Sequence, residues 1–344
     1  MQLGLSETLS SLVSRRFATA KDAGHLTFSA THLSIIHSSG LPFQLRYCPA
    51  LSKKPTGAPK PDGHAPAPKP DPFKDPSPDL LLTQFPPDNP SYTLVLNKFP
   101  VIHNHFILAT KEWKPQDHVL EKGDLEAAFA CVRAWGGDGE KRLFAFFNSG
   151  SESGASQPHR HLQFLPVEDM RHDGEGFGDW EPLIDRLAAD GQDGGDGLRR
   201  LSQLSFAHFA LPIPSNADAD VLYRMYLALY RAAVKAAQGT KETANEEPAV
   251  DGEAAISYNL ALTESTMMIC PRRNESAEIR VAAEETDDNS DSGVVALNGT
   301  ILAGTLMVKA EAEWNELRRN QENLTRVLST IGFPQPDSRG VSSL

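Results

Sequence analysis

Apolar residues recur along the chain with two different periods, which predict a mixture of helices and strands. A spacing of three to four residues is typical of helices, and runs of β-branched and aromatic residues between turn formers are typical of strands. The predicted helices are 5–23, capped by Ser6 and ended by Gly24, 124–135, capped by Asp124 and ended by Gly136, 218–237, ended by Gly239, and 312–330. The predicted strands and β-rich runs are 92–96, 101–110, 143–147, 159–166, 204–211, 258–269 and 297–309.

These elements alternate without a regular βαβ repeat, so we expect an α+β fold built on an antiparallel sheet. Residues 1–198 are predicted to form an N-terminal catalytic half, 199–335 a C-terminal half and 336–344 a tail. Two long insertions interrupt the first half. Residues 49–90 hold 13 of the 25 prolines and are expected to be an extended excursion, because proline neither continues a helix nor donates to a sheet. Residues 172–198 are rich in Gly and Asp and are expected to be a second loop.

Composition excludes several classes of protein. The 344 residues are 40% hydrophobic without a long apolar run, which excludes a transmembrane helix and predicts no membrane partner. The net charge of −12 argues against a protein that tracks nucleic acid, and acidic runs such as 281–292 are expected to be solvated loops.

The cysteines and the N-terminus bear on location. The three cysteines lie far apart, so neither a disulfide framework nor a cysteine zinc site is supported. A reducing compartment fits best, and we expect the cytoplasm, with the nucleus left open. For the first segment, a plain helix is favoured over a transit peptide.

The stretch FAFFNSGSESGASQPHRHLQFLP, residues 144–166, carries the candidate chemistry. Strand alternation places His159, His161 and Gln163 on one face and Arg160, Leu162 and Phe164 on the other. The preceding loop of glycines, serines and alanine can bring its N–H groups close to anionic oxygens. The sequence therefore predicts a phosphate pocket. Neutral imidazole is a good nucleophile near pH 7, which favours covalent nucleotidyl transfer.

Chance and metal binding offer two other interpretations of this stretch. Eleven histidines in a chain of this length give an H-x-H about 0.35 times by chance, and the second pair, His103 and His105, lacks both the loop and the glutamine. For that pair, a structural role at a strand end is favoured over chemistry. A zinc site at His159 and His161 is the less favoured alternative, because the loop offers hydroxyls and amides as the third ligand.

Several separated motifs carry a family resemblance. SGASQPHRHLQFLP, LFAFFNSG, LVLNKFP, YNLALT and AGTLMVK closely resemble the fungal diadenosine tetraphosphate phosphorylases. These are ATP adenylyltransferases in the histidine-triad branch that also contains galactose-1-phosphate uridylyltransferase. The resemblance implies a histidine-triad-like antiparallel sheet with flanking helices, in two halves with long loop insertions. It also implies phosphorolysis of diadenosine tetraphosphate to ATP and ADP through an adenylyl-histidine, with exchange of ADP and sulfate as a further reaction.

The resemblance assigns roles to the three motif side chains. His161 matches the nucleophile, and His159 would orient it or hydrogen-bond the site. Gln163 stands where histidine-triad hydrolases have a third histidine. An amide can hydrogen-bond a phosphoryl oxygen but cannot readily relay a proton, which favours an intermediate intercepted by phosphate.

The resemblance also implies contacts to the nucleotide or its phosphates. The implied residues are Lys54, Asn97, Lys98, Asn148, Gly154, Ala155, Ser156, Gln157, Asn298, Gly299, Thr300, Thr305 and Lys309. Taken singly, Lys54 fits a solvated lysine, Asn97 and Lys98 fit turn residues, and Lys309 fits a strand end. Their number favours binding, since a polyphosphate needs several cationic and amide donors. Thr305 stands where the family usually has methionine, and Lys54 is preferred to Lys53 because it precedes Pro55.

The expected partners are small molecules: diadenosine polyphosphates, ATP, ADP and phosphate. We expect no resident metal and no tightly bound organic cofactor, with a divalent cation, Mg²⁺, arriving with the polyphosphate. Two enzymatic alternatives are a histidine-triad nucleotide hydrolase and a hexose-1-phosphate uridylyltransferase. A dinucleotide sensor without turnover is the alternative from another class. Oligomeric state has no signal in the sequence.

Overall fold

The computed structural model describes residues 1–50, 70–136, 141–171, 180–239, 247–280 and 293–336. The helices are α1 Leu9–Asp22, α2 Lys122–Trp135, α3 Val167–Arg171, α4 Leu183–Asp190, α5 Ala219–Gln238, α6 Glu311–Arg319 and α7 Gln321–Ile331, with short 3₁₀ turns η2 Ser151–Ser153 and η5 Gly299–Ala303. The strands are β1 His32–Ser38, β2 Leu41–Tyr47, β3 Leu81–Phe85, β4 Tyr92–Leu96, β5 Phe106–Thr110, β6 Leu143–Ser149, β7 His161–Pro166, β8 Gln192–Asp193, β9 Arg199–Arg200, β10 Phe209–Pro212, β11 Tyr258–Leu262, β12 Thr266–Pro271, β13 Ser276–Glu278, β14 Val294–Ala296 and β15 Thr305–Val308.

One antiparallel sheet of ten strands runs through the molecule in the order β3-β4-β5-β7-β6-β11-β12-β10-β9-β8. Strand β6 of the first half pairs directly with β11 of the second, so the two halves share a single sheet. A smaller sheet, β1-β2-β15, also joins strands from the two ends of the chain. The expected α+β class on an antiparallel sheet is confirmed.

The same order of elements occurs twice in the large sheet. The first set is strand β5, helix α2 and strands β6 and β7, and the second is β10, α5, β11 and β12. In each set the first strand pairs with the last, β5 with β7 and β10 with β12. The pairing registers agree as well. The matched pairs are Phe106–Phe164 with Phe209–Ile269, and Leu143–Pro166 with Tyr258–Pro271.

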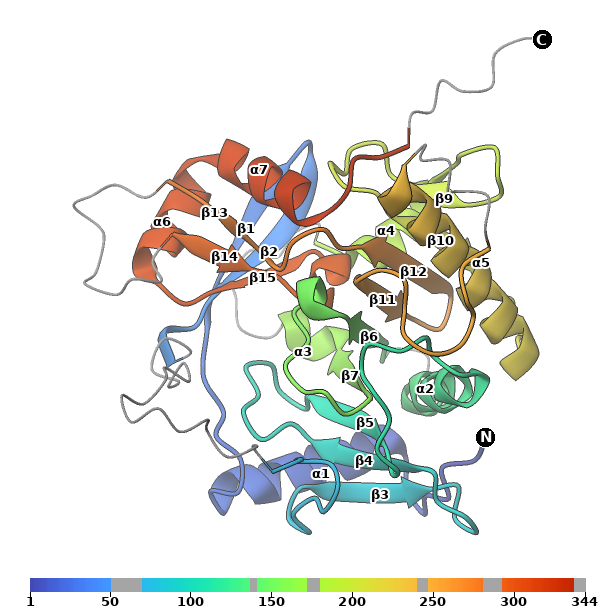
Figure 1. The fold of residues 1–344 in the computed structure, drawn as a ribbon. Helices are drawn as coiled ribbons and strands as arrows, with labels where there is room; N and C mark the ends of the chain where they lie inside the picture. Colours follow the sequence, from blue (N-terminus) through green and yellow to red (C-terminus); the bar gives the residue numbers. More distant parts are fainter. Residues whose placement is uncertain (51–69, 137–140, 172–179, 240–246, 281–292, 337–344) are drawn as a thin grey trace, which may run out of the picture.

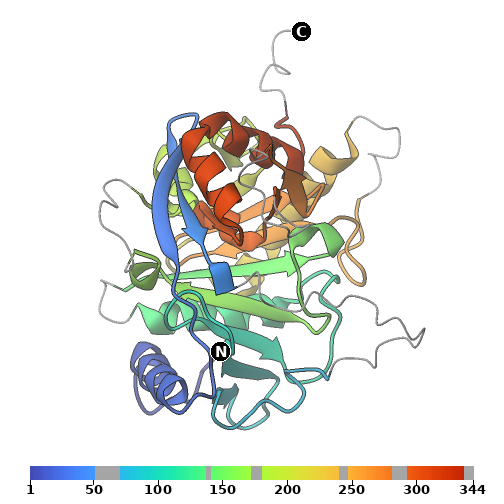
Figure 2. The ribbon, with the colours of Figure 1, turned by 90° about the vertical axis from the view of Figure 1, so that its left-hand side faces the viewer.

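The two faces of the large sheet are covered by different layers (Figure 1). Helices α1, α2 and α5 pack on one face, where their apolar sides meet Phe106, Phe164 and Ile269. The β1-β2-β15 sheet, η5 and helices α4, α6 and α7 form the second layer, which packs against residues such as Phe146 and Met268. In Figure 2 the β1-β2 hairpin stands beside α6 and α7 above the edge of the large sheet.

The proline-rich excursion is shorter than predicted. Residues 81–85, the proline-free run LLTQF, form the edge strand β3, which pairs with β4. Leu80 and Phe85 are buried in the core beneath α1. The prediction was wrong for this part because proline density was averaged over the whole stretch. Residues 51–69 of the excursion, including Lys54, lie outside the described residues.

The predicted loop 172–198 also contains regular structure. Residues 183–190 form α4, whose Leu183, Ile184 and Leu187 are buried in the second layer. The high Gly and Asp content on either side of this eight-residue helix led to the prediction of a loop. Residues 172–179 and 281–292 lie outside the described residues.

Several boundaries differ from the predicted ones. Helix α1 is capped by Thr8 rather than Ser6, and α2 by Glu121, with Asp124 closing a capping box at the third position. Strands begin later than predicted at 106, 161 and 209, the run 258–269 is a hairpin, and the run 297–309 begins with η5. The last helix divides at Asn320, which caps α7. The pair β1-β2 was not predicted. No helix in the described ranges is both long and apolar enough to cross a bilayer.

Candidate active site

The predicted face of β7 is present in the structure. The rings of both His159 and His161 lie against Phe73, at 5.7 and 5.0 Å between centroids. Gln163 pairs with Ile107 on the same face, whereas Leu162 and Phe164 enter the opposite core. His159 itself precedes the strand, in an isolated bridge with Pro115.

His161 is held as a neutral imidazole. Its Nδ1–H donates to the main-chain oxygen of His159 at 2.8 Å, which leaves the lone pair on Nε2. The residue is 3% exposed, and burial lowers the pKa of His161 to about 4. No group in the described part of the chain hydrogen-bonds Nε2. Nε2 is therefore unprotonated at neutral pH, with its lone pair free.

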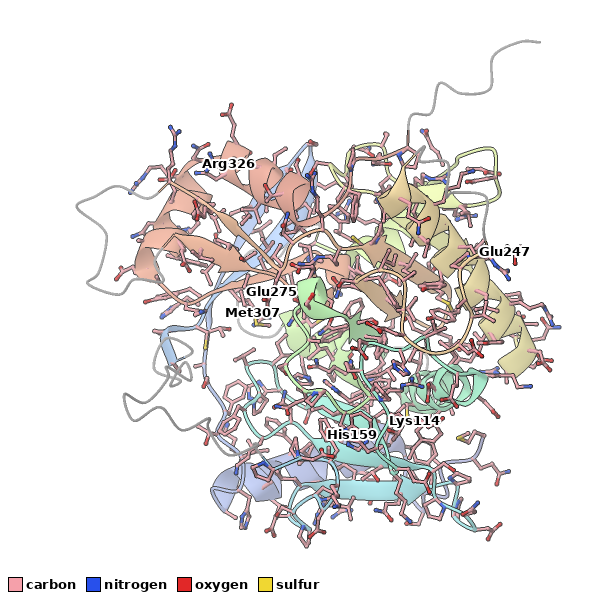
Figure 3. The ribbon with its side chains drawn as sticks, viewed as in Figure 1. Lys114, His159, Glu247, Glu275, Met307 and Arg326 are labelled. Atoms are coloured by element: carbon pink, nitrogen blue, oxygen red, sulfur yellow. The ribbon has the colours of Figure 1, made fainter. Side chains whose placement is uncertain are left out.

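His159 is tied to two other elements. Its Nδ1–H donates to Asp71 at 2.7 Å, and its Nε2 lies 3.0 Å from the Thr110 hydroxyl. Asp71 also accepts the N–H of Phe73, so one carboxylate holds both the histidine and the aromatic ring that packs against it. Figure 3 shows His159 low on the sheet near Lys114. His159 thus holds the His161 ring through its carbonyl and positions the segment that covers it.

Gln163 is oriented by a chain of hydrogen bonds that begins at the main chain. The N–H of Phe99 donates to the Asn97 side-chain oxygen, and the Asn97 amide donates to Nδ1 of His105. Nε2–H of His105 then donates to the Gln163 oxygen at 3.1 Å. Burial lowers the pKa of His105 to about 4, so this tautomer is neutral. The Gln163 amide group is left to donate elsewhere.

The sequence interpretation favoured a structural role at a strand end for both His103 and His105. His103 packs against Phe28 at 4.0 Å and Phe17 at 5.7 Å between ring centroids, and His105 lies immediately before β5. The sequence did not reveal the hydrogen bond from His105 to Gln163. The signal that could have found His105 is its place at the start of a strand predicted to neighbour the motif strand.

The small-residue loop is joined to the C-terminal half. Asn148 accepts hydrogen bonds from Asn259 and from the N–H of Gly299, both at 2.9 Å. Gly154 has φ of +78°, and a Cβ there would lie 2.8 Å from Leu297 O and from Asn298, so the close approach requires glycine. The predicted contacts Asn148, Gly154, Asn298 and Gly299 are therefore brought together, although they come from separate halves.

The remaining predicted contacts lie in three settings. Thr300 bonds to Asn298 and to Thr305 O, while the buried Thr305 donates to Gln44 at 3.1 Å. Ala155 and Gln157 are half-buried and Ser156 is exposed. Lys98 is exposed over the Phe99 ring and Lys309 is half-buried at the end of β15. The roles of all these residues, and of Lys54, stay predictions. Among the described residues, no cluster of three His, Cys, Asp or Glu side chains could hold a metal ion.

Comparisons with known proteins identify the family of the chain. The chain matches two family models, the Ap4A phosphorylase N-terminal domain over residues 2–176 and the ATP adenylyltransferase C-terminal domain over residues 202–334. Diadenosine 5',5'''-P1,P4-tetraphosphate phosphorylase 2 of Saccharomyces cerevisiae is 28% identical over 351 residues, 96% of each protein.

Solved structures give the same result for the fold. The crystal structure of yeast Ap4A phosphorylase Apa2 has a TM-score of 0.76 at 25% identity and covers 98% of each chain. Apa2 in complex with Ap4A has a TM-score of 0.75 at 24% identity, covering 97% of this chain and all of that one. Because the first family model spans more than half of the sequence, the chain belongs to the Ap4A phosphorylase family.

Proposed function

We propose that this protein cleaves diadenosine tetraphosphate with phosphate to give ATP and ADP, through an adenylyl group carried on His161. The observation that carries the proposal is the state of His161, whose Nδ1–H donates to a carbonyl while Nε2 is unprotonated at neutral pH. A relative with this fold has been crystallised with Ap4A, which supports the choice of substrate.

The first step forms one bond and breaks one. Nε2 of His161 attacks the α-phosphorus, the bond between that phosphorus and the bridging oxygen breaks, and ATP leaves with the electron pair. In the second step an oxygen of inorganic phosphate attacks the same phosphorus from the opposite side of the P–N bond. That bond breaks, ADP forms and the neutral imidazole returns.

Gln163 fits the needs of both steps. Because His105 occupies its oxygen, the Gln163 N–H₂ group can donate to a non-bridging oxygen as negative charge shifts there. An amide neither accepts nor gives up a proton readily near neutral pH, so Gln163 does not activate water as an acid or base. This arrangement favours capture of the adenylyl group by phosphate rather than hydrolysis.

The further parts of the proposal concern the substrate and its surroundings. The predicted contacts from both halves, with Lys98 and Lys309, would hold the polyphosphate, and Mg²⁺ would arrive bound to that chain as part of the substrate. The substrates are small nucleotides, and we place the enzyme in the cytoplasm.

A labelling experiment tests the proposal. The protein is mixed briefly with α-labelled Ap4A without phosphate, and then divided between acid and alkali. We expect label that is stable in alkali and lost in acid, and release of labelled ADP once phosphate is added. Equal labelling of His161→Ala would contradict the proposal, and turnover at full rate without phosphate would indicate a hydrolase.

A further inference from the structure

The two strands that carry the site separate at the nucleophile. Pairing of β6 with β7 runs from Leu143–Pro166 to Phe146–Gln163 and stops there. Continued pairing would place Asn148 opposite His161. A side chain from outside the sheet occupies that position instead.

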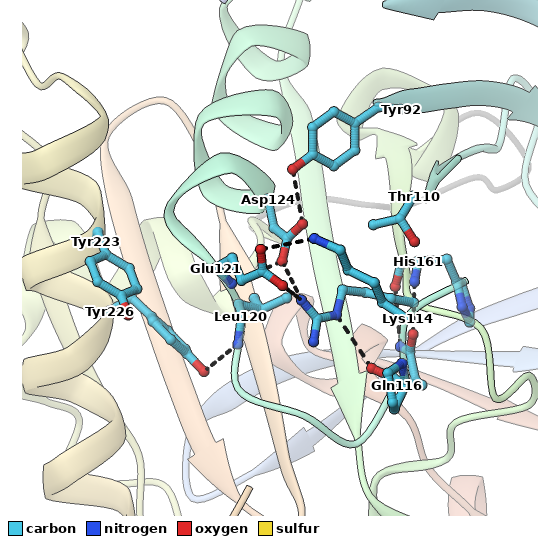
Figure 4. Close-up of polar contacts among 12 residues, drawn as sticks. Tyr92, Thr110, Lys114, Gln116, Leu120, Glu121, Asp124, His161, Tyr223 and Tyr226 are labelled. Atoms are coloured by element: carbon cyan, nitrogen blue, oxygen red, sulfur yellow. Dashed lines mark hydrogen bonds and ion pairs between the residues drawn. The ribbon is translucent and has the colours of Figure 1, made fainter. Parts of the chain in front are cut away.

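That side chain is Gln116, which is 4% exposed. Its Nε2 donates to the main-chain oxygens of Asn148, at 2.8 Å, and of His161, at 3.1 Å. Its Oε1 accepts the main-chain N–H of His161 at 2.7 Å. Both peptide groups of the nucleophile are thus bonded to one amide, as Figure 4 shows.

The chain around Gln116 fixes its place. The N–H of Gln116 donates to Pro158 O and the N–H of Arg160 donates to Lys114 O, both at 2.8 Å. Residues 114–116 therefore run antiparallel beside residues 158–160, joined by an isolated bridge between Pro115 and His159. On the other side, Thr110 N–H donates to Arg160 O at 3.1 Å.

On the opposite face of this segment, ion pairs hold Arg160 in place. Arg160, 2% exposed, donates to Asp124 at 2.8 Å and to Glu121 at 3.1 Å, and Tyr92 donates to the same Asp124. Figure 4 shows this network beside Gln116 and His161. The main chain on both sides of His161 is therefore held by fixed partners, and Gln116 supplies those at the nucleophile itself.

We propose that Gln116 is the positioning residue that sets the line of attack of His161. The imidazole is bonded to the carbonyl of His159, so the direction of Nε2 follows the peptides on either side of His161. Glutamine fits the position because one amide offers the acceptor and the two donors that these three main-chain groups require. The proposal rests on the proposed role of His161 as nucleophile.

The test compares three variants of the full chain. Gln116→Met keeps length and removes the hydrogen bonds, and we expect kcat for phosphorolysis to fall roughly 30- to 100-fold, with KM changed less than about threefold, since small misplacements of reacting atoms cost about this much. Gln335→Met is the matched control. Gln335 also donates its amide to two main-chain oxygens, of Leu201 and Leu204, and its variant is expected to keep kcat.

Gln116→Glu provides a second measurement on a variant that keeps the shape. Its ionised carboxylate would face two carbonyl oxygens, which with burial raises its pKa. Protonation restores one donor. We therefore expect the kcat of this variant, relative to the native protein, to rise about fivefold or more as the pH falls from 8 to 6.

A spectroscopic readout separates this proposal from the proposed function. In ¹⁵N-labelled protein, the His161 Nδ1–H signal should exchange faster with water in Gln116→Met than in the native protein or Gln335→Met. Native protein without phosphate-dependent ADP release would refute the proposed function, and the Nδ1–H signal would still decide whether Gln116 fixes the His161 ring. An unchanged signal, or equal loss of kcat in Gln116→Met and Gln335→Met, would overturn the inference.

Discussion

The two repeated units of the sheet share their pairing registers, but on one face the first unit carries polar side chains where the second is largely apolar. In the shared register, His161 of β7 corresponds to Thr266 of β12, and Gln163 corresponds to Met268. Met268 is fully buried with Ala210 and Ala261, whereas Gln163 is half-buried and bonded to His105.

The difference follows from what covers each unit. The second layer, including Leu183 and Leu187 of α4, packs directly on β12 and excludes water from it. On β7, Phe73 and polar side chains take the place of that cover near His161. One backbone arrangement therefore serves as core where the second layer is complete, and as a candidate active site where that layer gives way to polar groups.

Removing the proposed nucleophile, compared with changing the corresponding residue of the other unit, should give the largest difference in rate. His161→Ala removes the proposed nucleophile, and we expect the rate of ADP formation to fall about 10⁴-fold or more. Thr266→Ala, at the corresponding position, should keep the rate within about threefold. Initial rates with Ap4A and phosphate measure both. A residual rate in His161→Ala within tenfold of native would show that the two units do not differ in this way.

The next position along the strand should give a smaller effect. Gln163→Met gives β7 the residue of β12, removes the amide donor and leaves His105 without its acceptor, so we expect kcat to fall about 10²- to 10³-fold. The reverse change, Met268→Gln, buries an amide among apolar groups and should lower the free energy of unfolding by about 1–3 kcal/mol with kcat unchanged. Steady-state rates and urea midpoints separate the two. Loss of activity in Met268→Gln at full stability would contradict the assignment.

The two histidines of the HNH sequence offer a comparison within one loop. His105→Phe frees the Gln163 amide to turn, and we expect kcat to fall roughly 10- to 30-fold. His103→Phe preserves an aromatic ring against Phe28 and should keep the rate. Both rates come from the same ADP assay. Equal losses in the two variants would mean that the loop acts as a whole and that His105 has no separate role.

The sequence predicted what depends on local pattern. Alternation along β7 identified the face with His161 and Gln163, and spacing identified α2 and α5. It did not reveal His105 or Gln116, because their contacts depend on which strands become neighbours and on where a ladder opens. Strand β3 was missed because a run of five residues between prolines does not by itself predict a strand. It forms through pairing with β4.

Two buried histidines of the same tautomer, one in each repeated unit but at different positions in the register, provide the most sensitive test. His161 and His208, just before β10, each donate Nδ1–H to the oxygen two residues earlier at 2.8 Å, and burial lowers the pKa of each to about 4. Nε2 of His208, however, accepts the Leu201 N–H at 2.9 Å. His208 is therefore a buried imidazole of the same tautomer whose second nitrogen is occupied.

The pH dependence of adenylyl transfer should follow His161 alone. In single turnovers without phosphate, the rate should change less than about twofold from pH 8 to 5.5 and fall only as the pH approaches 4, because Nε2 stays unprotonated above its pKa. An acid limb near pH 6.5 would contradict this. Stability should behave differently: His161, His208 and His105 all accept protons more readily when unfolded, so the free energy of unfolding should decline as the pH falls from about 6.5 towards 4. His208→Asn should lessen that decline without moving the rate profile, since only the open Nε2 takes part in the transfer.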